Sequence, residues 1–526
     1  MEPMNTQQIT TIHAAASHFG RLRPDDPAIF YEDEQVTFGE LDRESNRAAH
    51  ALRGAGPRPG ARVAYFGKDS PAYYEIALAC AKSGTVLVPV NWRLSSHEVD
   101  HILRDSGASL LFVEPEFKAA AEHAIAGPAA DGRLEMIIID PPSGFHAWKA
   151  GYPETGLDPG TGPDDPVIQI YTSGTTGLPK GVVLAHRSFF TFRESMIRAG
   201  ADWLDWRPAD VSLVSFPGSY VAGMSWFMHG LVAGLPSVIM RMFIAEEAVR
   251  LIERHRVSIT FAAPAMLHMM LAEPGAGPAT FASLRKVAYG AAPMPDALLR
   301  SCMEIMRCQF AQIYASSESG NVATMLPPAD HVPGSPLLRS VGLPCPGNEL
   351  RIIDRDGRPL PPGAVGQVCI RTPARMVGYW GMPEATAQTL ADGWLRMGDA
   401  GYVDEDGYLY LRDRIDDTII VAGQNVYPAE VETALQELPA VAEAAVIGVP
   451  HDQWGEVVRA YVCLAEGATA TPGELRRSLR GRIADFKLPA EYVLVDALPR
   501  NPSGKVLRRV LREQARTGQA PEETVP

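Results

Sequence analysis

Residues 171–181 read Tyr171-Thr-Ser-Gly-Thr-Thr-Gly-Leu-Pro-Lys180-Gly181. They directly follow the apolar run of residues 167–171, which predicts a buried strand. Glycines let a backbone curl so that its N–H groups converge on an anion, hydroxyl groups add further donors, and a lysine adds a positive charge. The stretch therefore predicts a loop that binds a polyphosphate, with a flexible polar turn as the alternative. It is not a Walker A loop, because Gly-x-x-x-x-Gly-Lys-Ser/Thr cannot be placed on it.

The size and charge of the chain limit the class of protein. With 526 residues the chain is too long for one ordinary core, so we expect two or more domains. The formal net charge of −14 argues against a protein that holds nucleic acid by phosphate contacts. The six cysteines form no Cys-x-x-Cys pair, so neither a disulfide framework nor a zinc site is expected, and a reducing compartment fits.

The N-terminal residues contain no basic segment followed by an apolar one, so no signal peptide is expected. No apolar run approaches the roughly 20 residues that a membrane helix needs. We therefore expect a cytoplasmic protein without an integral membrane segment, whose partners are small molecules and not nucleic acid. A homo-oligomer is compatible with these features.

Helix-like and strand-like patterns alternate along the first part of the chain. Residues 36–41 are expected to lead into a helix that runs through residue 51. Further helices are expected over residues 72–82 and 97–104, and strands over residues 62–66, 85–90 and 109–113. Such alternation predicts an α/β protein whose parallel sheets are covered by helices. Residues 141–166 are rich in Pro, Gly and Asp and predict a surface connection, whereas residues 188–198 predict a helix. Short runs and turns over residues 341–371 predict a β-rich subdomain, and residues 441–516 a small α+β domain.

Residues 172–181 resemble the phosphate loop of the adenylate-forming (ANL) superfamily, which includes acyl-CoA synthetases, peptide-synthetase adenylation domains and luciferases. Further stretches along nearly the whole chain resemble other motifs of this superfamily, and they follow one another in the same order as in its members. The likeness is closest to fatty-acyl-CoA synthetases. The resemblance implies a large N-terminal domain of helix-covered sheets with a β-rich subdomain, and a small, mobile α+β C-terminal lid domain. We place these domains at residues 1–414 and 415–526, with a hinge near Asp416.

The resemblance implies that this chain binds ATP, Mg²⁺ and CoA. Glu318 would hold Mg²⁺, because a hard cation needs an oxygen ligand near the phosphates. Asp399 would accept hydrogen bonds from the ribose hydroxyls, with a turn-capping aspartate as the alternative. The residues assigned to ATP or AMP are Thr172, Ser173, Gly174, Thr175, Thr176, Gly177, Gly290, Ala291, Ala292, Tyr314, Ser317, Asp399 and Arg414.

Residues 212–229 are dense in apolar and aromatic side chains, which a plain core would also explain. The resemblance places the acid-binding pocket here, and the residues assigned to it are Tyr220, Gly223, Met224 and Trp226. Relatives commonly carry a histidine at the position of Tyr220. Because residues 216–228 contain no carboxylate, an α-amino acid is not expected as the substrate. A neutral pocket favours an apolar acid, with a fatty or medium-chain acid first and an aryl acid second.

Lys505 follows a Pro-x-Gly pattern and resembles the catalytic lysine of the superfamily. It would bridge the carboxylate and the α-phosphate and stabilise the charge as it builds. Glu318 and Lys180 complete the expected catalytic set. After adenylation, the lid domain would rotate about Asp416 and bring Gly423 to the site of the CoA step.

These motifs together predict an AMP-forming acid:CoA ligase, which makes an acyl adenylate, releases pyrophosphate and transfers the acyl group to CoA. An aryl-acid CoA ligase is one alternative. Another is an acyl-AMP ligase that loads a carrier protein, which is disfavoured because such ligases usually carry an inserted segment that is not seen here. A non-catalytic nucleotide- or acyl-binding protein is disfavoured because four expected site residues are present together: Lys505, Glu318, Asp399 and Arg414. Residues 378–380, Gly-Tyr-Trp, match a signature of the superfamily without a clear chemistry.

Overall fold

The computed structural model describes residues 9–125, 134–140, 143–172, 179–414, 417, 419–421, 424–451, 455–500 and 506–517, with the backbone alone at residues 413, 414 and 425. The chain divides into two compact units. The first unit comprises Met1–Leu350 and Cys369–Met397, and the second unit comprises Arg351–Val368 and Gly398–Pro526. The domain boundary that we expect at residue 414 stays a prediction.

A seven-stranded sheet of the first unit carries the strands on either side of the predicted phosphate loop. Its strand order is β18-β8-β7-β4-β3-β5-β6. The strands are β3 (Arg62–Gly67), β4 (Val86–Asn91), β5 (Leu110–Val113), β6 (Glu135–Ile138), β7 (Pro166–Thr172), β8 (Lys180–Ala185) and β18 (Gly378–Tyr379). The pairings among β3, β4, β5, β6 and β7 are parallel, whereas β8 and β18 pair in the antiparallel sense. The predicted α/β class is confirmed.

The helices next to these strands begin and end where the sequence supplies caps. They are α2 (Phe38–Gly54), α3 (Pro71–Ser83), α4 (Ser96–Ser106) and α5 (Lys118–Ile125). A capping box of Thr37 and Glu40 starts α2, and α4 starts with the same arrangement. Ser70 caps α3, Pro71 takes its first position, and Gly84 ends it in the left-handed conformation. The helices predicted in this part of the chain are therefore confirmed.

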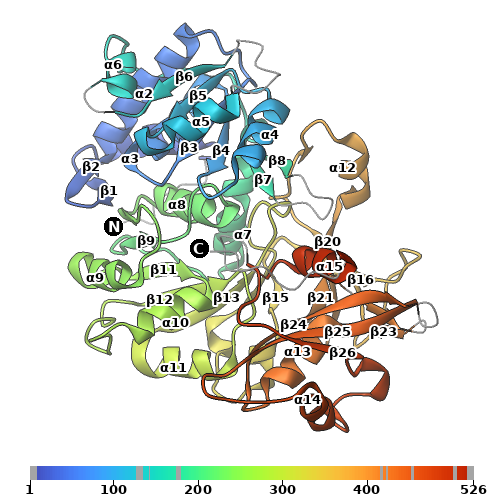
Figure 1. The fold of residues 1–526 in the computed structure, drawn as a ribbon. Helices are drawn as coiled ribbons and strands as arrows, with labels where there is room; N and C mark the ends of the chain where they lie inside the picture. The colour runs from blue at the N-terminus through green and yellow to red at the C-terminus, as the bar shows by residue number, and fades with distance from the viewer. Residues whose placement is uncertain are drawn as a thin grey trace. The chain divides into compact units, whose positions relative to one another are not determined.

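A nine-stranded sheet is the other main sheet of the first unit, with the strand order β15-β14-β13-β12-β11-β9-β10-β1-β2. Its strands are β1 (Pro27–Tyr31), β2 (Glu34–Thr37), β9 (Ser212–Val214), β10 (Ser237–Ile239), β11 (Ile259–Ala262), β12 (Lys286–Gly290), β13 (Gln309–Tyr314), β14 (Thr324–Leu326) and β15 (Leu343–Pro344). The helices of this region are α1 (Ile12–Leu22), α7 (Thr191–Ala199), α8 (Val221–Ala233), α9 (Ala245–His255), α10 (Pro264–Ala272) and α11 (Asp296–Met306) (Figure 1). Because β9, β11, β12 and β13 are parallel, their carboxyl ends meet at one side of the sheet, where α/β proteins bind ligands.

One local prediction is wrong, and another is confirmed with shifted bounds. Residues 141–166 are not a plain surface connection, because α6 (Gly144–Lys149) forms within them. Phe145 and Lys149 of this helix are buried, so packing stabilises a helix where the composition alone predicts a loop. The helix predicted over residues 188–198 is divided into the 3₁₀ helix η3 (His186–Phe189) and α7.

The predicted β-rich region is a five-stranded sheet. Its strands are β16 (Glu349–Ile353), β17 (Gly366–Arg371), β19 (Leu390–Ala391), β20 (Trp394–Val403) and β21 (Leu409–Arg414), with α12 (Pro383–Thr389) nearby in the sequence.

The second unit contains another five-stranded sheet with helices, as the predicted α+β domain requires. Its strands are β22 (Ile419–Val421), β23 (Gln424–Val426), β24 (Val441–His451), β25 (Gly455–Leu464) and β26 (Glu491–Leu494), and its helices are α13 (Pro428–Gln436), α14 (Pro472–Leu479) and α15 (Arg508–Thr517). Leu435, Val446 and Val458 lie in its hydrophobic core. Across all the helices that the structure describes, none is long and apolar enough to cross a membrane.

Candidate active site

The predicted phosphate loop joins two paired strands of the seven-stranded sheet. β7 ends at Thr172 and β8 begins at Lys180, and these two residues lie opposite each other in the antiparallel register. Val167, Ile168 and Ile170 are buried, which confirms the buried strand predicted before the loop. The predicted loop residues Ser173, Gly174, Thr175, Thr176 and Gly177 lie outside the described residues.

Glu318 lies in a tight turn that follows β13. Ser316 and Ser319 close this turn, because the backbone N–H of each donates to the side-chain oxygen of the other, at 2.9 and 3.1 Å. Gly320 has a φ of 69°, and a Cβ at this position would lie 2.1 Å from the carbonyl oxygen of Ala374, so the position requires glycine. The turn therefore fixes the backbone that carries Glu318, which is half-buried.

Tyr379 contacts both charged residues that we expect to act on the phosphates. Its hydroxyl donates a hydrogen bond to Oε1 of Glu318 at 2.8 Å. The Nζ atom of Lys180 lies 5.5 Å from the centre of the Tyr379 ring, within range of a cation–π contact. The structure thus brings Lys180 and Glu318 to one tyrosine. No chemistry was assigned to Tyr379 from the sequence, although it lies in the Gly-Tyr-Trp signature.

The segment that we expect against adenine leaves the carboxyl ends of two neighbouring strands. Gly290 ends β12 and pairs in register with Ile313 of β13, and Tyr314 ends β13. A Cβ at Gly290 would lie 2.3 Å from the Ile313 carbonyl oxygen, so this position also requires glycine. Ala291 has a φ of 66°, a left-handed conformation that costs an alanine about 1 kcal/mol. Backbone strain of this kind concentrates at functional sites, and Ala291 and Ala292 are exposed.

Tyr220 directly precedes α8, the helix of the predicted acid-binding pocket. Its hydroxyl accepts a hydrogen bond from Nδ2 of Asn91 at 2.7 Å, and burial raises its pKa. Gly223 is closely packed, because a Cβ there would lie 2.3 Å from a backbone carbonyl oxygen of the preceding loop. Met224 and Trp226 are buried. The predicted pocket residues therefore share the start of one helix, and Asn91 joins them although no sequence motif indicated it.

Six aromatic rings pack continuously beside α8, and we call them the aromatic cluster: Phe192, Trp206, Phe216, Trp226, His229 and Phe261. Taken in the order 216, 261, 226, 206, 229 and 192, successive ring centres lie 4.8 to 5.9 Å apart. Near one end of the cluster, next to Phe216, Cε2 of Phe261 lies 3.5 Å from the position that a Cβ of Gly290 would occupy. The cluster therefore reaches the segment that we expect to bind adenine.

A buried carboxylate lies against the loop before α8. Both oxygens of Asp69 accept from the backbone N–H of Gly218 at 3.0 Å, and Oδ2 also accepts from the Tyr74 hydroxyl at 2.9 Å. Tyr73 donates to the Gly218 carbonyl at 2.7 Å. Burial raises the pKa of Asp69 to about 7. Residues 216–228 do lack a carboxylate of their own, and the fold supplies one to this loop from a position 149 residues away.

The expected ribose-binding residues belong to the second unit. Asp399 of β20 and Arg414 of β21 lie opposite each other in the antiparallel register, and Asp399 is half-buried. Ser317 belongs to the first unit and lies in the turn that carries Glu318. Lys505, Asp416 and Gly423 lie outside the described residues, so their roles stay predictions.

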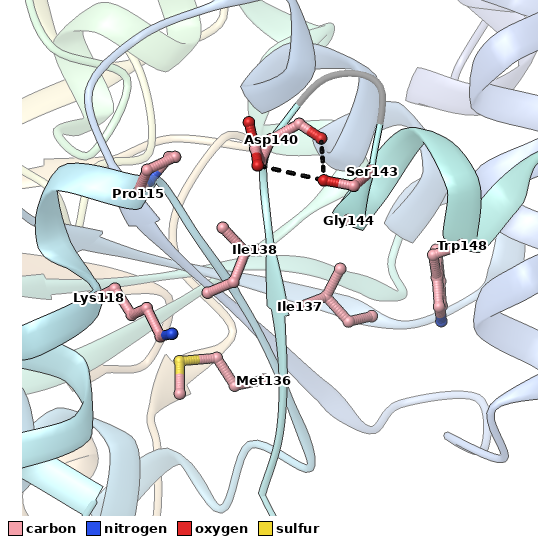
Figure 2. Close-up of a pocket in the computed structure, with 9 residues that line it drawn as sticks. All are labelled: Pro115, Lys118, Met136, Ile137, Ile138, Asp140, Ser143, Gly144 and Trp148. Atoms are coloured by element: carbon pink, nitrogen blue, oxygen red, sulfur yellow. Dashed lines mark hydrogen bonds between the residues drawn. The ribbon is translucent and has the colours of Figure 1, made fainter.

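A cavity of about 550 Å³ lies at the β6 end of the seven-stranded sheet, away from the residues of the predicted site. Figure 2 shows the side chains that line it: Pro115, Lys118, Met136, Ile137, Ile138, Asp140, Ser143, Gly144 and Trp148. Ser143 donates from Oγ to Oδ2 of Asp140 at 3.1 Å. Residues 141 and 142, next to this lining, lie outside the described residues, and we assign the cavity no role.

Two stretches of the sequence match known protein families. Residues 17–380 match the family of AMP-binding enzymes, and residues 430–505 match the C-terminal domain of AMP-binding enzymes. The first match spans more than half of the chain, so the chain belongs to the family of AMP-binding enzymes. It is an enzyme of the AMP-forming ligase type, with the adenylate-forming fold that the motifs indicated.

Individual relatives give a finer comparison. The chain is 52% identical to the fatty acid–acyl-carrier-protein ligase ScoC of Streptomyces coeruleorubidus, over 98% of both chains. It is 36% identical to the indoleacetate–CoA ligase of Aromatoleum aromaticum, over 94% of this chain and 96% of the relative. The solved structure of the o-succinylbenzoate coenzyme A synthetase MenE from Bacillus subtilis, in complex with ATP and a magnesium ion, is similar with a TM-score of 0.82. The two chains are 31% identical, and the match covers 95% of this chain and 99% of MenE.

Proposed function

We propose that this chain is an ATP-dependent ligase that activates an apolar carboxylic acid as its acyl adenylate and then transfers the acyl group to a thiol. The closeness of Phe261, a ring of the aromatic cluster, to Gly290 of the predicted adenine segment is the observation that supports this proposal. An acyl adenylate joins an apolar group to a nucleotide. Its binding site must therefore place an apolar surface directly beside a nucleotide-binding surface.

The proposed reaction has two steps. In the first step, a carboxylate oxygen of the acid attacks the α-phosphorus of ATP, and the bond from that phosphorus to pyrophosphate breaks. In the second step, a thiolate sulfur attacks the acyl carbon, and the bond from that carbon to AMP breaks. An enzyme accelerates such phosphoryl transfer mainly by positioning the groups and stabilising charge.

The charged residues of this chain would supply that stabilisation. Lys180 and the loop of residues 173–178 would hold the pyrophosphate as it leaves. Lys505 would bridge the carboxylate and the α-phosphate, where negative charge gathers in the first step. Tyr314 would lie against adenine, and Asp399 would accept from the ribose hydroxyls.

Glu318 fits the coordination of Mg²⁺, because a carboxylate supplies the oxygen ligands that this ion prefers and the turn of Glu318 is fixed. Within the described ranges, no three His, Cys, Asp or Glu side chains gather closely enough to hold a metal ion by themselves. Mg²⁺ in nucleotide sites commonly takes its other ligands from phosphate oxygens and water, and we propose the same for a cation at Glu318. When bound, Mg²⁺ supplies positive charge that stabilises the leaving pyrophosphate.

The thiol of a carrier protein is our first candidate for the acyl acceptor, and CoA is the second. The relative with 52% identity is an acyl-carrier-protein ligase. Because that relative aligns over 98% of both chains, the lack of an inserted segment no longer argues against a carrier protein. CoA is supported by the indoleacetate–CoA ligase, which is less similar at 36% identity.

The pocket favours an acid without a charged side group. Five of the six rings of the aromatic cluster belong to phenylalanine or tryptophan and are largely apolar, and the nearby carboxylate of Asp69 is engaged by Gly218 and Tyr74. Residues 211–220 contain no carboxylate that could pair with the ammonium group of an amino acid. We propose a fatty or medium-chain acid first, in line with the 52% identical relative, and an aryl acid second, in line with the indoleacetate ligase.

Pyrophosphate release tests the proposal. The purified protein is given ATP, Mg²⁺ and one acid from a panel of fatty, aryl and amino acids, with a carrier protein bearing its thiol, with CoA, or without an acceptor. We expect release with fatty or aryl acids, none with amino acids, and sustained turnover with the carrier protein. Sustained turnover with CoA alone would favour the second acceptor. No release with any acid would contradict the ligase.

A lysine variant is the matched control for this assay. Lys505→Ala should lower pyrophosphate release by about 100-fold, since it removes the charge that stabilises the first step. It should still bind ATP, because the phosphate loop and the adenine segment are unchanged. Wild-type release by Lys505→Ala would show that this lysine does not act in the first step.

A further inference from the structure

The Gly-Tyr-Trp signature has no role in the proposed function, yet the structure attaches it firmly to the strand that leaves the phosphate loop. β18 pairs with β8 so that Tyr379 lies opposite Val182. The backbone N–H of Trp380 donates to the carbonyl of Gly181 at 2.7 Å. The position of Tyr379 is therefore tied to the backbone that begins at Lys180.

The side chain of Trp380 holds the same segment through separate contacts. Its indole N–H donates to the carbonyl of Asp105 at 2.8 Å, and the guanidinium of Arg62 lies 3.4 Å from the centre of its ring. Arg62 also donates to the side chain of Gln169 in β7 at 2.9 Å. These contacts do not involve the Tyr379 hydroxyl, so the backbone of the segment should stay in place when that hydroxyl is removed.

The residues before the signature attach it to the turn of Glu318. The backbone N–H of Met376 donates to the carbonyl of Glu318 at 2.8 Å. The guanidinium of Arg187 donates to the carbonyl of Pro373 and, at 2.8 Å, to that of Arg375. One short segment thus bridges the strand of Lys180 and the turn of Glu318, and Tyr379 contacts a side chain on each of them.

We propose that Tyr379 is a positioning residue that holds the carboxylate of Glu318 in the orientation needed to bind magnesium and ATP, and that its ring orients Lys180. This inference rests on the proposed function of Glu318. The Tyr379 hydroxyl donates to Oε1, so it fixes the rotation of the carboxylate and the direction in which the other oxygen points. Tyr379 acts through Glu318 and does not touch the reacting atoms.

Tyr379→Phe tests this role, because it removes the hydroxyl and keeps the ring that Lys180 faces. The readout is the dissociation constant of ATP, measured by calorimetry once with Mg²⁺ and once with EDTA. We expect the constant with Mg²⁺ to rise by about tenfold. The constant in EDTA should not change, because Glu318 meets the nucleotide through the cation. The melting temperature of the protein without nucleotide should stay at the wild-type value.

Tyr152→Phe is the matched control. Tyr152 is also half-buried, and its hydroxyl lies beside Gly54 of α2 instead of beside Glu318. This variant should leave both dissociation constants unchanged. Two results would overturn the inference: a Tyr379→Phe protein that binds ATP equally weakly with and without Mg²⁺, or one with a melting temperature below that of the wild type. Either result would show that the substitution disturbs the fold and not only the orientation of Glu318.

A second variant separates the inference from the proposed function. We expect Glu318→Gln to weaken binding only in the presence of Mg²⁺, and Tyr379→Phe to add nothing in that background, since both changes act on one carboxylate. If Tyr379→Phe bound ATP as the wild type does while Glu318→Gln bound it more weakly, the role of Tyr379 would be overturned and that of Glu318 would stand. Unchanged magnesium dependence in Glu318→Gln would overturn the assignment of Glu318 and the inference with it.

Discussion

Asp69 carries a carboxyl group whose pKa is raised to about 7 by burial. Between about pH 4 and pH 7 the folded protein therefore holds more protons at this residue than the unfolded chain does. The free energy of unfolding that this residue contributes falls as the pH rises through that interval. The effect belongs to the loop before α8, the helix of the predicted acid-binding pocket, because Asp69 accepts a hydrogen bond from Gly218.

Asp69→Asn should remove this pH dependence, since an amide keeps an oxygen for the Gly218 N–H and carries no charge. Between about pH 5 and pH 8, the wild-type protein should lose about 2 kcal/mol of unfolding free energy relative to the variant. Urea denaturation of both proteins at the two pH values measures the difference. Equal pH dependence of the two proteins would show that Asp69 titrates normally.

Gly223 has no room for a side chain. A Cβ there would lie 2.3 and 2.4 Å from two backbone carbonyl oxygens, so Gly223→Ala must move the first turn of α8. We expect a loss of about 1–3 kcal/mol of stability and weaker binding of the acid. Gly473→Ala is the control, because a Cβ at Gly473 meets nothing within 4 Å and lies in a helix. Thermal melts and pyrophosphate release compare the two variants.

Elements with local signals were predictable from the sequence. The helix predicted over residues 72–82 is α3 (Pro71–Ser83), because its periodicity and its caps, Ser70 and Gly84, are all neighbours in the chain. α6 was missed, because its stability comes from burial of Phe145 and Lys149 and not from its Gly- and Pro-rich surroundings.

The partners of the site residues could not be predicted in the same way. Motifs indicated Glu318 and Tyr220, but their hydrogen-bond partners lie 61 and 129 positions away along the chain. A single sequence carries no signal for pairings at such distances. Tyr379 and Asn91 therefore emerged only from the fold, and the residue types of the site were easier to predict than the contacts that orient them.

The aromatic cluster makes a prediction about the acid. Trp226 lies between Trp206 and Phe261, so Trp226→Ala should open space beside Phe261, the ring next to Gly290 of the predicted adenine segment. The kcat/KM for a bulkier acid should rise about tenfold relative to that for a smaller acid, at a cost of about 3–5 kcal/mol in stability. Trp148→Ala, at the cavity of Figure 2, is the control that should leave this ratio unchanged. An unchanged ratio in Trp226→Ala would place the acid elsewhere.

At the scale of the whole molecule, each of the two units consists of two separate segments of the chain. The chain enters the second unit at Arg351, returns to the first at Cys369, and enters the second again at Gly398. Rotation of the lid domain is expected at Asp416, in the last of these segments. The expectation comes from the sequence alone, because Asp416 lies outside the described residues.

A hinge needs backbone freedom that proline removes. Asp416→Pro should slow thioester formation by about tenfold, equal to about 1.4 kcal/mol, and should slow pyrophosphate release less. Asp416→Ala keeps the backbone freedom and should leave both rates near the wild-type values. Single-turnover measurements of each half-reaction supply the comparison. Wild-type rates of both steps in Asp416→Pro would show that the hinge lies elsewhere.

The short strand β18 should protect the protein from aggregation. Val377 and Trp380 donate their backbone N–H groups to the carbonyls of Val183 and Gly181, and so cover the outer edge of β8. An uncovered strand edge offers a template on which a second molecule can pair and aggregate. Val377→Pro removes one of these donors and should increase light scattering on warming, whereas Val377→Ala keeps the donor and should not. The segment that carries Tyr379, which we propose to position Glu318, would then also keep separate molecules from joining their sheets.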